Sequence, residues 1–403
     1  MKILLSSESY WPNKDGGAVF EHYLVHQLMA AGHEVRVLVP GKSWRHYNER
    51  DNGSYIYRTA SIRLPLNRDY KVTYYARHQV LRALNDFKPD IVHIHTLALT
   101  GMSLLRHAKK QGIPVVATNH LMPENVLMSF PSYIMNASWV RKVFWKVLVK
   151  FHNKFIAVTT PTASAAQLLK DNGLTRPLTV VSNGVDTSFF RPLSSEPKNS
   201  ANILKRFNLP KQYFIYLGRV NAEKRLDMLI HGFALAIKDC PDLHLVIAGT
   251  GNRSEELKDL ANKLGIGEHV HFLGRVSDDE KRALYQHAEF FAITSPAELQ
   301  SIVVLEAAAC GLPIIAVDEV ALRELCHDER NGYLLQMDDI PACVRAIEKL
   351  HSDKSTRQKF SNYSRDLIVR HHAQADTLKQ YLTFYEFALK LHRDSHNAKK
   401  HLL

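Results

Sequence analysis

Residues 214–251 read FIYLGRVNAEKRLDMLIHGFALAIKDCPDLHLVIAGTG, and this stretch decides the fold class. A short apolar run at 214–217 is followed by a segment with helical spacing at 225–237 and by a second apolar run at 244–248. Strand, helix and strand in this order form the repeating unit of a parallel sheet. The alternation continues through predicted helices at 254–264, 277–287 and 302–310 and predicted strands at 270–272, 290–293 and 313–316. The sequence therefore predicts a doubly wound α/β domain over residues 211–372.

The first half of the chain shows the same alternation. Predicted strands lie at 3–6, 34–39, 90–95, 115–118, 155–158 and 179–181, and predicted helices lie at 19–31 and 99–111. We therefore expect a first α/β domain over residues 1–188, joined by a Pro/Ser/Asn-rich linker, 189–210, to the second. Residues 373–403 are expected to form a helix to 391, which could pack back on the first domain, and then a disordered basic tail.

Composition and charge limit the possible functions. The chain has 403 residues, 45% of them apolar and 23% charged, which are ordinary globular values. Its formal charge of +12 attracts anions, whether nucleic acid, anionic lipid or phosphorylated small molecules. Four isolated cysteines favour a reducing compartment, and no run is long and apolar enough for a spanning helix. We expect a cytoplasmic protein.

Two phosphate-binding motifs are incomplete. Pro40-Gly-Lys-Ser43 resembles the end of a P-loop, but Arg36 stands where the leading glycine belongs. Gly249-Thr-Gly251 lacks the third glycine of a dinucleotide fingerprint. An ATPase and a nicotinamide-dependent dehydrogenase are both disfavoured.

The strongest functional candidates follow predicted strands, where open α/β sheets bind ligands. Gly16-Gly17 opens the first helix and lets backbone N–H groups approach an anion, although a plain flexible loop fits equally well. Arg219 and Lys224 are five residues apart at a helix start, which suits a diphosphate, the alternative being solvated surface charges. Glu298 and Glu306 are separated by seven residues, and Glu306 stands in an otherwise apolar helix. Isolated buried carboxylates are costly, and carboxylates accept hydrogen bonds well from vicinal hydroxyls, which indicates a sugar or ribose.

Motifs along nearly the whole chain share one pattern. They are Gly16-Gly17, Asp90-Ile-Val-His-Ile-His95, Asn183-Gly-Val-Asp186, Gly218-Arg219 with Glu223-Lys224, Ala248-Gly-Thr-Gly251, Phe272-Leu-Gly-Arg275, and Glu298-x7-Glu306 followed by Ala307-Ala-Ala-Cys-Gly-Leu-Pro313. In these the chain resembles the retaining, nucleotide-sugar-dependent glycosyltransferases of the GT-B type (family 4-like, group 1), which include bacterial glycolipid glucosyl- and mannosyltransferases. The resemblance implies two Rossmann-like domains that face each other across a cleft.

The resemblance also implies roles for individual residues. Arg219 and Lys224 would bind the donor diphosphate, Glu298 the sugar hydroxyls and Glu306 the nucleotide ribose. Further donor-binding positions are Gly16, Gly17, Gly249, Gly251, the Arg275-Val276 backbone near the base, and the Ser301 and Ile302 N–H groups on the phosphate. Many members have glycines after the first glutamate, where this chain reads Leu299-Gln-Ser301.

Histidines of the first domain have two possible uses. His120 directly follows a predicted strand, and in the family a histidine here faces the transferred sugar; the alternative is a core histidine. His93 and His95 lie on one face of a predicted strand, and we expect them to be packed rather than to bind a metal, because no third ligand with suitable spacing appears. We expect neither a metal nor another cofactor besides the donor substrate.

A basic amphipathic segment indicates a membrane surface. Residues 139–154 carry five Lys/Arg and no acid, with apolar residues at helical spacing. This pattern fits a helix on anionic lipid, with Trp139, Phe144, Trp145 and Phe151 at the interface, or a core helix with a basic outer face. A lipid acceptor would place the enzyme peripherally on the inner face of the cell membrane.

The resemblance thus implies an enzyme that transfers a hexose, most simply from UDP-glucose, to an acceptor hydroxyl such as that of diacylglycerol or another glycolipid precursor. GDP-mannose as donor and a soluble acceptor stay open, as do same-face attack and double displacement. We expect a monomer or weak dimer that binds no nucleic acid. A sugar-nucleotide epimerase and a nucleic-acid-binding protein are the more distant alternatives.

Overall fold

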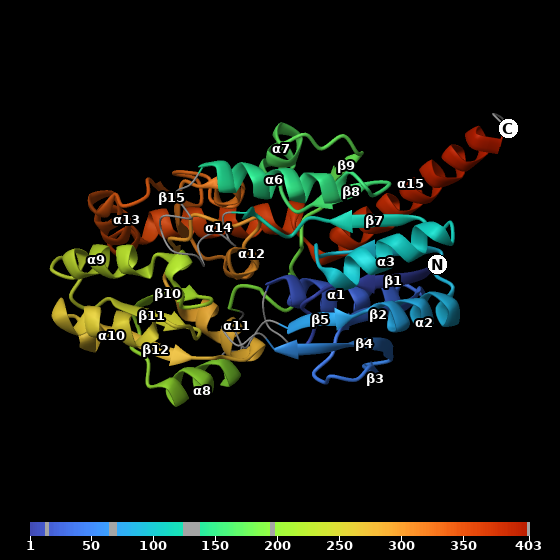
Figure 1. Cartoon of the computed structure of the whole chain (residues 1–403). Helices are drawn as coiled ribbons and strands as arrows, with labels where there is room; N and C mark the ends of the chain where they lie inside the picture. The colour runs from blue at the N-terminus through green and yellow to red at the C-terminus, as the bar shows by residue number, and fades with distance from the viewer. Residues whose placement is uncertain (13–15, 64–70, 124–137, 194–197, 401–403) are drawn as a thin grey trace. The chain divides into compact units, whose positions relative to one another are not determined.

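The computed structural model describes residues 1–12, 16–63, 71–123, 138–193 and 198–400 (Figure 1). It divides the chain into two compact units. Among the described residues, the first unit comprises 1–123, 138–182 and 377–400, and the second comprises 183–376. Each unit is built on one sheet, and the predicted α/β class with two parallel-sheet domains is confirmed.

The sheet of the first unit has the strand order β3-β4-β2-β1-β6-β7-β8-β9, with β5 paired to β4. Six strands, from β2 to β9 along this order, run parallel, and β2 also pairs in parallel with β4. Strands β3 and β5 are antiparallel to β4. The strands are β1 (Lys2–Ser6), β2 (Glu34–Pro40), β3 (Tyr47–Asp51), β4 (Ser54–Arg63), β5 (Lys71–Tyr75), β6 (Ile91–Ile94), β7 (Val115–Thr118), β8 (Val158–Thr160) and β9 (Leu178–Val180).

Helices connect these strands and pack their apolar faces against the sheet. Strands that are covered on both faces are buried and apolar on both sides. Strands β6 and β7 are buried along their whole length. The helices of this unit are α1 (Gly16–Ala30), α2 (Arg77–Phe87), α3 (Leu99–Lys110), α6 (Ser138–His152), α7 (Ala163–Asp171) and most of α15 (Gln374–Lys400).

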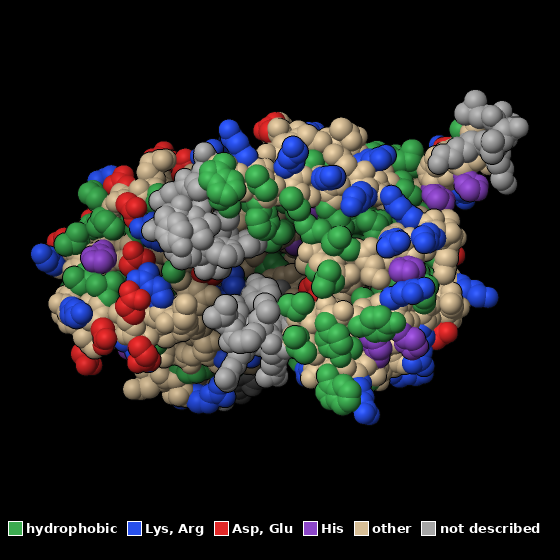
Figure 2. All heavy atoms as spheres, in the orientation of Figure 1, with side chains coloured by type: hydrophobic (Ala, Val, Ile, Leu, Met, Phe, Trp, Pro, Cys, Tyr) green, Lys and Arg blue, Asp and Glu red, His purple; other side chains and the backbone are tan. Residues whose placement is uncertain are grey.

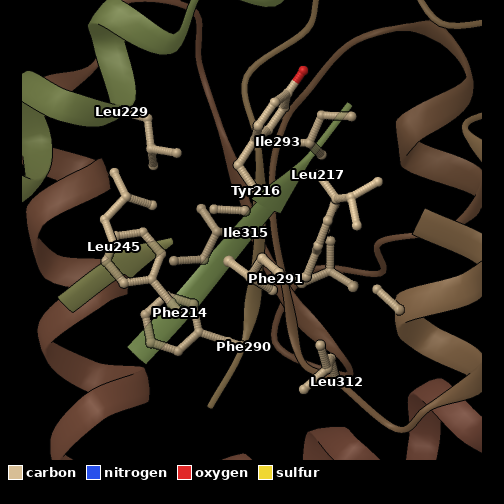
Figure 3. Packing of buried hydrophobic residues seen from close by; sticks show 14 of the residues in the cluster. Phe214, Tyr216, Leu217, Leu229, Leu245, Phe290, Phe291, Ile293, Leu312 and Ile315 are labelled. Atoms are coloured by element: carbon tan, nitrogen blue, oxygen red, sulfur yellow. The ribbon is translucent and has the colours of Figure 1, made fainter. Parts of the chain in front are cut away.

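The second unit has a parallel sheet of order β12-β11-β10-β13-β14-β15. Its central strand β10 (Tyr213–Leu217) is buried throughout, and Phe214 stacks on Phe290 with ring centroids 4.8 Å apart (Figure 3). The other strands are β11 (His244–Ala248), β12 (Val270–Gly274), β13 (Phe291–Ile293), β14 (Ile314–Val317) and β15 (Gly332–Leu335). The helices are α8 (Lys198–Phe207), α9 (Leu226–Ala236), α10 (Ser254–Lys263), α11 (Asp278–His287), α12 (Ile302–Ala309), α13 (Ile340–Ser352), α14 (Lys354–His371) and the short turns η1 (Ala222–Lys224), η2 (Gly267–His269) and η3 (Val320–Glu324).

The structure differs from the sequence predictions in several places, and three of these differences have a clear physical reason or change the expected organisation of the chain. The antiparallel strands β3, β4 and β5 were not predicted, since β3 (sequence YNERD) has no apolar alternation and is held by its partner strand. The stretch 189–210 contains helix α8, because Leu204 packs on the core of the second unit. The tail after residue 391, predicted to be disordered, continues as helix through Lys400.

Helix α15 attaches to the first unit through aromatic side chains. Tyr381, Phe384 and Tyr385 are buried. The Tyr385 hydroxyl lies 2.8 Å from His93 Nδ1, and His93 Nε2 lies 2.7 Å from the Thr118 hydroxyl. The C-terminal segment therefore belongs to the core of the first unit.

Candidate functional site

The loops after β10 and β11 touch through their backbones. The Gly218 N–H donates to the Ala248 carbonyl over 3.0 Å, and the Val220 N–H donates to the Thr250 carbonyl over 3.0 Å. A Cβ at Gly249 would lie 1.8 Å from the Gly218 oxygen, and one at Gly251 would lie 2.1 Å from the Val220 oxygen. Both positions require glycine because no side chain fits between the two loops, and the contact positions the segment that carries Arg219 and Lys224.

The two predicted cations have different surroundings. Arg219 is 56% exposed and pairs with Glu223 over 3.2 Å. Lys224 ends the turn η1 and is 13% exposed; its Nζ lies 2.5 Å from Glu298 Oε1 and 3.4 Å from the Ser295 hydroxyl. The structure thus brings Lys224 and Glu298 together, although they are far apart in the sequence.

The loop after β13 holds η1 in place. The Thr294 hydroxyl contacts the carbonyl oxygens of Lys224 and Arg225 at 2.8 and 2.9 Å. Thr294 and Ser295 are fully buried. Neither was predicted from the sequence, and their position directly before Glu298, after an apolar strand, is the signal that could have indicated them.

Helix α12 follows Glu298 in the chain. Ser301 is its N-cap residue and is buried, and Ile302 is its first residue. The first N–H groups of a helix have no partner inside the helix and carry partial positive charge, so they favour an anion. The Ser301 side chain makes no capping bond to them.

Glu306, further along α12, is buried and has partners that the sequence did not predict. Lys281 Nζ lies 2.6 Å from its Oε1, and the Tyr285 hydroxyl donates to its Oε2 over 3.2 Å. Burial raises the pKa of Glu306, and the attraction of Lys281 opposes this shift. Burial also lowers the pKa of Lys281, but Glu306 and Asp278 outweigh it and raise that pKa overall, so the ammonium is retained.

Arg275 and Val276 follow β12. Arg275 is exposed, while Val276 packs partly against the core. Strands β10, β11, β12 and β13 are parallel, so the loops after them share one edge of the sheet. This edge combines cations, the N–H groups of a helix N-terminus and carboxylates, a set that can bind an anion bearing hydroxyl groups.

In the first unit, His120 follows β7 and stacks on His95, with ring centroids 5.3 Å apart. The Nε2 atom of His120 lies 3.0 Å from His95 Nδ1, and Glu21 Oε1 lies 3.9 Å from that His95 nitrogen. Burial, and then the nearby His152, lowers the pKa of His120 to about 4. The imidazole is therefore neutral near pH 7, and it lines a small cavity with Asn119.

Packing of His93 agrees with the prediction, since Thr118 and Tyr385 occupy its two nitrogens. His95 differs. The fold adds Glu21 from α1 to His95 and His120, and these three could together hold a metal ion. Sequence spacing did not show this third ligand, because Glu21 is distant in the chain. The predicted independence from metals stays a prediction.

Gly16 and Gly17 are the first residues of α1, as expected for a loop-to-helix junction. Gly16 is exposed and Gly17 partly buried. Residues 13–15, which precede them, lie outside the described residues.

The basic helix α6 is partly a core helix. Trp145 and Phe151, predicted to meet a membrane, are 5% and 4% exposed and pack in the core of the first unit, so that part of the prediction is wrong. Trp139 is 68% exposed, and Val143 and Val147 lie exposed on the same helix. Lysines and arginines gather over α6 (Figure 2), and those of the helix, all exposed, are Arg141, Lys142, Lys146 and Lys150. No helix in the described part of the chain is long and apolar enough to cross a membrane.

Two family models match the chain. Residues 201–367 match the model "Glycosyl transferases group 1", and residues 14–189 match "Glycosyltransferase Family 4". The first match contains every candidate residue of the second unit, and the second match contains His120 and Gly16-Gly17.

Individual proteins resemble the chain over most of its length. An alpha-monoglucosyldiacylglycerol synthase of Streptococcus pneumoniae is 27% identical over 94% of this chain and 89% of its own. A D-inositol 3-phosphate glycosyltransferase of Salinispora tropica is 28% identical over 79% of this chain and 67% of its own. An Anabaena protein, HepE, whose crystal structure contains UDP and glucose, superposes with a TM-score of 0.74 at 16% identity, over 96% of this chain and 99% of the other.

Proposed function

This chain belongs to the group 1 and family 4 glycosyltransferases, and from that premise we propose that it transfers glucose from UDP-glucose, with retention of configuration, to a hydroxyl of a membrane lipid such as diacylglycerol. The observation that carries the donor side is the contact of Lys224 with Glu298 beside the first turn of α12. Membership of this family favours a glycosyltransferase over the two more distant alternatives, a sugar-nucleotide epimerase and a nucleic-acid-binding protein.

We assign the donor diphosphate to Arg219, Lys224 and the N–H groups of Ser301 and Ile302. Without a donor, the Lys224 ammonium and the Glu298 carboxylate satisfy each other at 2.5 Å. A diphosphate offers Lys224 a stronger anionic partner, and Glu298 then becomes free to accept hydrogen bonds from the sugar hydroxyls. Negative charge grows on the phosphate as the sugar leaves, so these cations stabilise the transition state more than the bound substrate.

We assign the nucleoside to the residues around Glu306. Lys281 lies 2.6 Å from this carboxylate and opposes the rise of its pKa by burial, and in this proposal the Glu306 oxygens accept hydrogen bonds from the ribose hydroxyls. The Arg275-Val276 backbone meets the base in this proposal, and the glycines Gly249 and Gly251 let the two loops approach the diphosphate closely.

On the first unit, we assign His120 to the transferred sugar and Gly16-Gly17 to the donor anion. A neutral imidazole can donate or accept a hydrogen bond without placing a positive charge next to an oxocarbenium-like sugar. Attack from the same face, with the departing phosphate as base, fits these residues, and the proposed reaction needs no metal.

A lipid acceptor is supported by two observations. The Streptococcus relative is named for a glucosyldiacylglycerol product, and α6 exposes Trp139 among four cations. Lysines and arginines near an anionic membrane each contribute about 1 kcal/mol of attraction. The enzyme would work as a peripheral protein on the cytoplasmic leaflet, as a monomer or weak dimer.

The test is a matrix of donors and acceptors. UDP-glucose, UDP-galactose, UDP-N-acetylglucosamine and GDP-mannose are each offered with diacylglycerol, monoglucosyldiacylglycerol or inositol phosphate, and product and its anomeric configuration are measured. We expect an α-glucosyl lipid from UDP-glucose, with turnover reduced about a hundredfold in Lys224→Ala. Preference for GDP-mannose would contradict the proposed donor, and product only with inositol phosphate would contradict the proposed lipid acceptor. A β-linked product would contradict retention of configuration.

A further inference from the structure

Three side chains of the first unit that could ligate a metal converge, and none of them has a role in the proposed transfer. His22 and His26 lie one turn apart on α1, and Asp51 ends strand β3. His22 Nε2 lies 3.0 Å from Asp51 Oδ2 and also 3.0 Å from His26 Nε2. All three ligand atoms lie within 4.8 Å of one another.

Hydrogen bonds alone do not satisfy this arrangement. A ring nitrogen of histidine has a single in-plane position, which holds either one proton or one lone pair. His22 Nε2 can therefore donate to Asp51 or accept from His26, but it cannot do both well. A cation at the point where the three atoms converge would interact favourably with all of them at once.

The ligands suit one class of ion. Two imidazoles and a carboxylate are a common ligand set for zinc, whose bonds to nitrogen and oxygen of about 2.0–2.2 Å place neighbouring ligands about 3.3 Å apart. The observed 3.0 Å separations need only a small outward shift. Histidines at positions i and i+4 lie on one face of a helix, so α1 presents both to Asp51.

We propose that His22, His26 and Asp51 form a binding site for a divalent transition-metal ion, Zn²⁺, with water completing the coordination. His22 and Asp51 side chains are 15% and 21% exposed, so an ion can enter. The Trp11 ring stacks on His22 with centroids 4.8 Å apart and restricts the orientation of the imidazole.

The ion would link two elements that are distant in the sequence. Asp51 lies 29 residues after His22 in the sequence. It precedes the turn between β3 and β4, in which Asn52 and Gly53 both have positive φ. Binding would join this turn to α1, the helix that starts at Gly16. Zinc would thus stabilise the first unit, and the proposed metal-free transfer is compatible with it.

The experiment measures metal binding by the full-length chain without any donor or acceptor, so it is independent of the proposed transfer reaction. The protein is stripped with a chelator, titrated with Zn²⁺ in a calorimeter, and scanned for Tm; Co²⁺ serves as a spectroscopic substitute. The chain has 22 histidines, so variants must assign the site. The test variants are His22→Gln with His26→Gln, and Asp51→Asn.

The matched control is His392→Gln with His396→Gln, a histidine pair with the same spacing on α15 in which His396 is exposed and His392 is partly buried. His95→Gln reports on the second possible metal cluster. We expect the wild type to bind one Zn²⁺ at this site and to gain about 5 °C in Tm at a hundredfold excess over Kd. Both test variants should bind at least about tenfold more weakly and lose the tetrahedral Co²⁺ bands, while both controls keep them.

Unchanged binding and spectra in the His22/His26 variant would overturn the proposal, as would loss of binding only in His95→Gln or in the control pair. Circular dichroism of the metal-free variants shows whether they are folded. If His22→Gln with His26→Gln does not fold, the partly exposed Asp51→Asn alone decides, since it removes the charged ligand and keeps the shape of the side chain.

Discussion

At the scale of single residues, the two glutamates of the Glu-x7-Glu motif differ in their surroundings. Glu298 is paired with one lysine at the edge of the sheet, whereas Glu306 is buried between Lys281 and Tyr285. A buried charge is stable only with partners that replace water. The motif therefore combines a carboxylate that can exchange partners with one held in a fixed position.

This difference predicts distinct effects on donor binding. In Glu298→Gln we expect UDP affinity to stay within about twofold while kcat falls about a hundredfold, because in the proposed donor complex Glu298 contacts the sugar and Lys224 contacts the diphosphate. In Glu306→Gln we expect UDP to bind about tenfold more weakly, because a hydrogen bond to a charged group is lost. Calorimetry with UDP and steady-state kinetics measure both; equal UDP affinities in the two variants would contradict the assigned roles.

A second prediction concerns Lys281. Lys281→Met leaves Glu306 buried without its cation, and removal of one partner of a buried pair costs about 3–5 kcal/mol of unfolding free energy. Lys258→Met, which breaks an exposed pair with Glu255, should change stability by less than about 1 kcal/mol. Urea unfolding of both variants makes the comparison. Similar losses would show that burial does not decide the strength of these pairs.

At the scale of elements, helix α6 has one buried face and one exposed face. One face buries Trp145, Leu148 and Phe151 in the core. The other exposes Trp139 and the four cations. The core-helix alternative is therefore confirmed for one face of α6, whereas membrane binding through the exposed basic face stays a prediction.

We predict that α6 binds anionic membranes. Flotation should recover the wild type with vesicles containing phosphatidylglycerol at low salt, and recovery should fall at high salt because screening shortens the range of the attraction. Lys142→Glu with Lys146→Glu should abolish flotation. The control, Lys238→Glu with Lys263→Glu, makes the same charge change on exposed positions of the second unit and should float normally. Flotation of the wild type with neutral vesicles only would contradict an electrostatic role.

At the scale of the whole molecule, buried neutral histidines make stability depend on pH. Burial lowers the pKa of His93 to about 3 and the pKa values of His120 and His152 to about 4. In the unfolded chain a histidine titrates near 6.5. Between these values the unfolded state binds more protons than the folded state, so stability rises with pH in this window.

We therefore predict that the unfolding free energy is largest above about pH 6.5 and falls as pH decreases toward 4, each such histidine contributing up to about 1.4 kcal/mol per pH unit. Urea unfolding between pH 5 and 8 measures the slope. His152→Gln should reduce the slope between pH 5 and 6, whereas His231→Gln, an exposed histidine on α9, should leave it unchanged. A flat profile in the wild type would contradict the prediction.

Local patterns in the sequence determined the α/β class, most strand positions in both units, and the candidate residues Arg219, Lys224, Glu298 and Glu306. Such features depend on neighbours a few residues away, so periodicity and loop position are enough to predict them. The tertiary structure decided the rest. It paired Lys224 with Glu298 and Lys281 with Glu306, buried Trp145 but exposed Trp139, and brought Asp51 to His22 and His26. These outcomes depend on side chains far apart in the sequence, whose proximity and burial arise only when the sheets and helices pack.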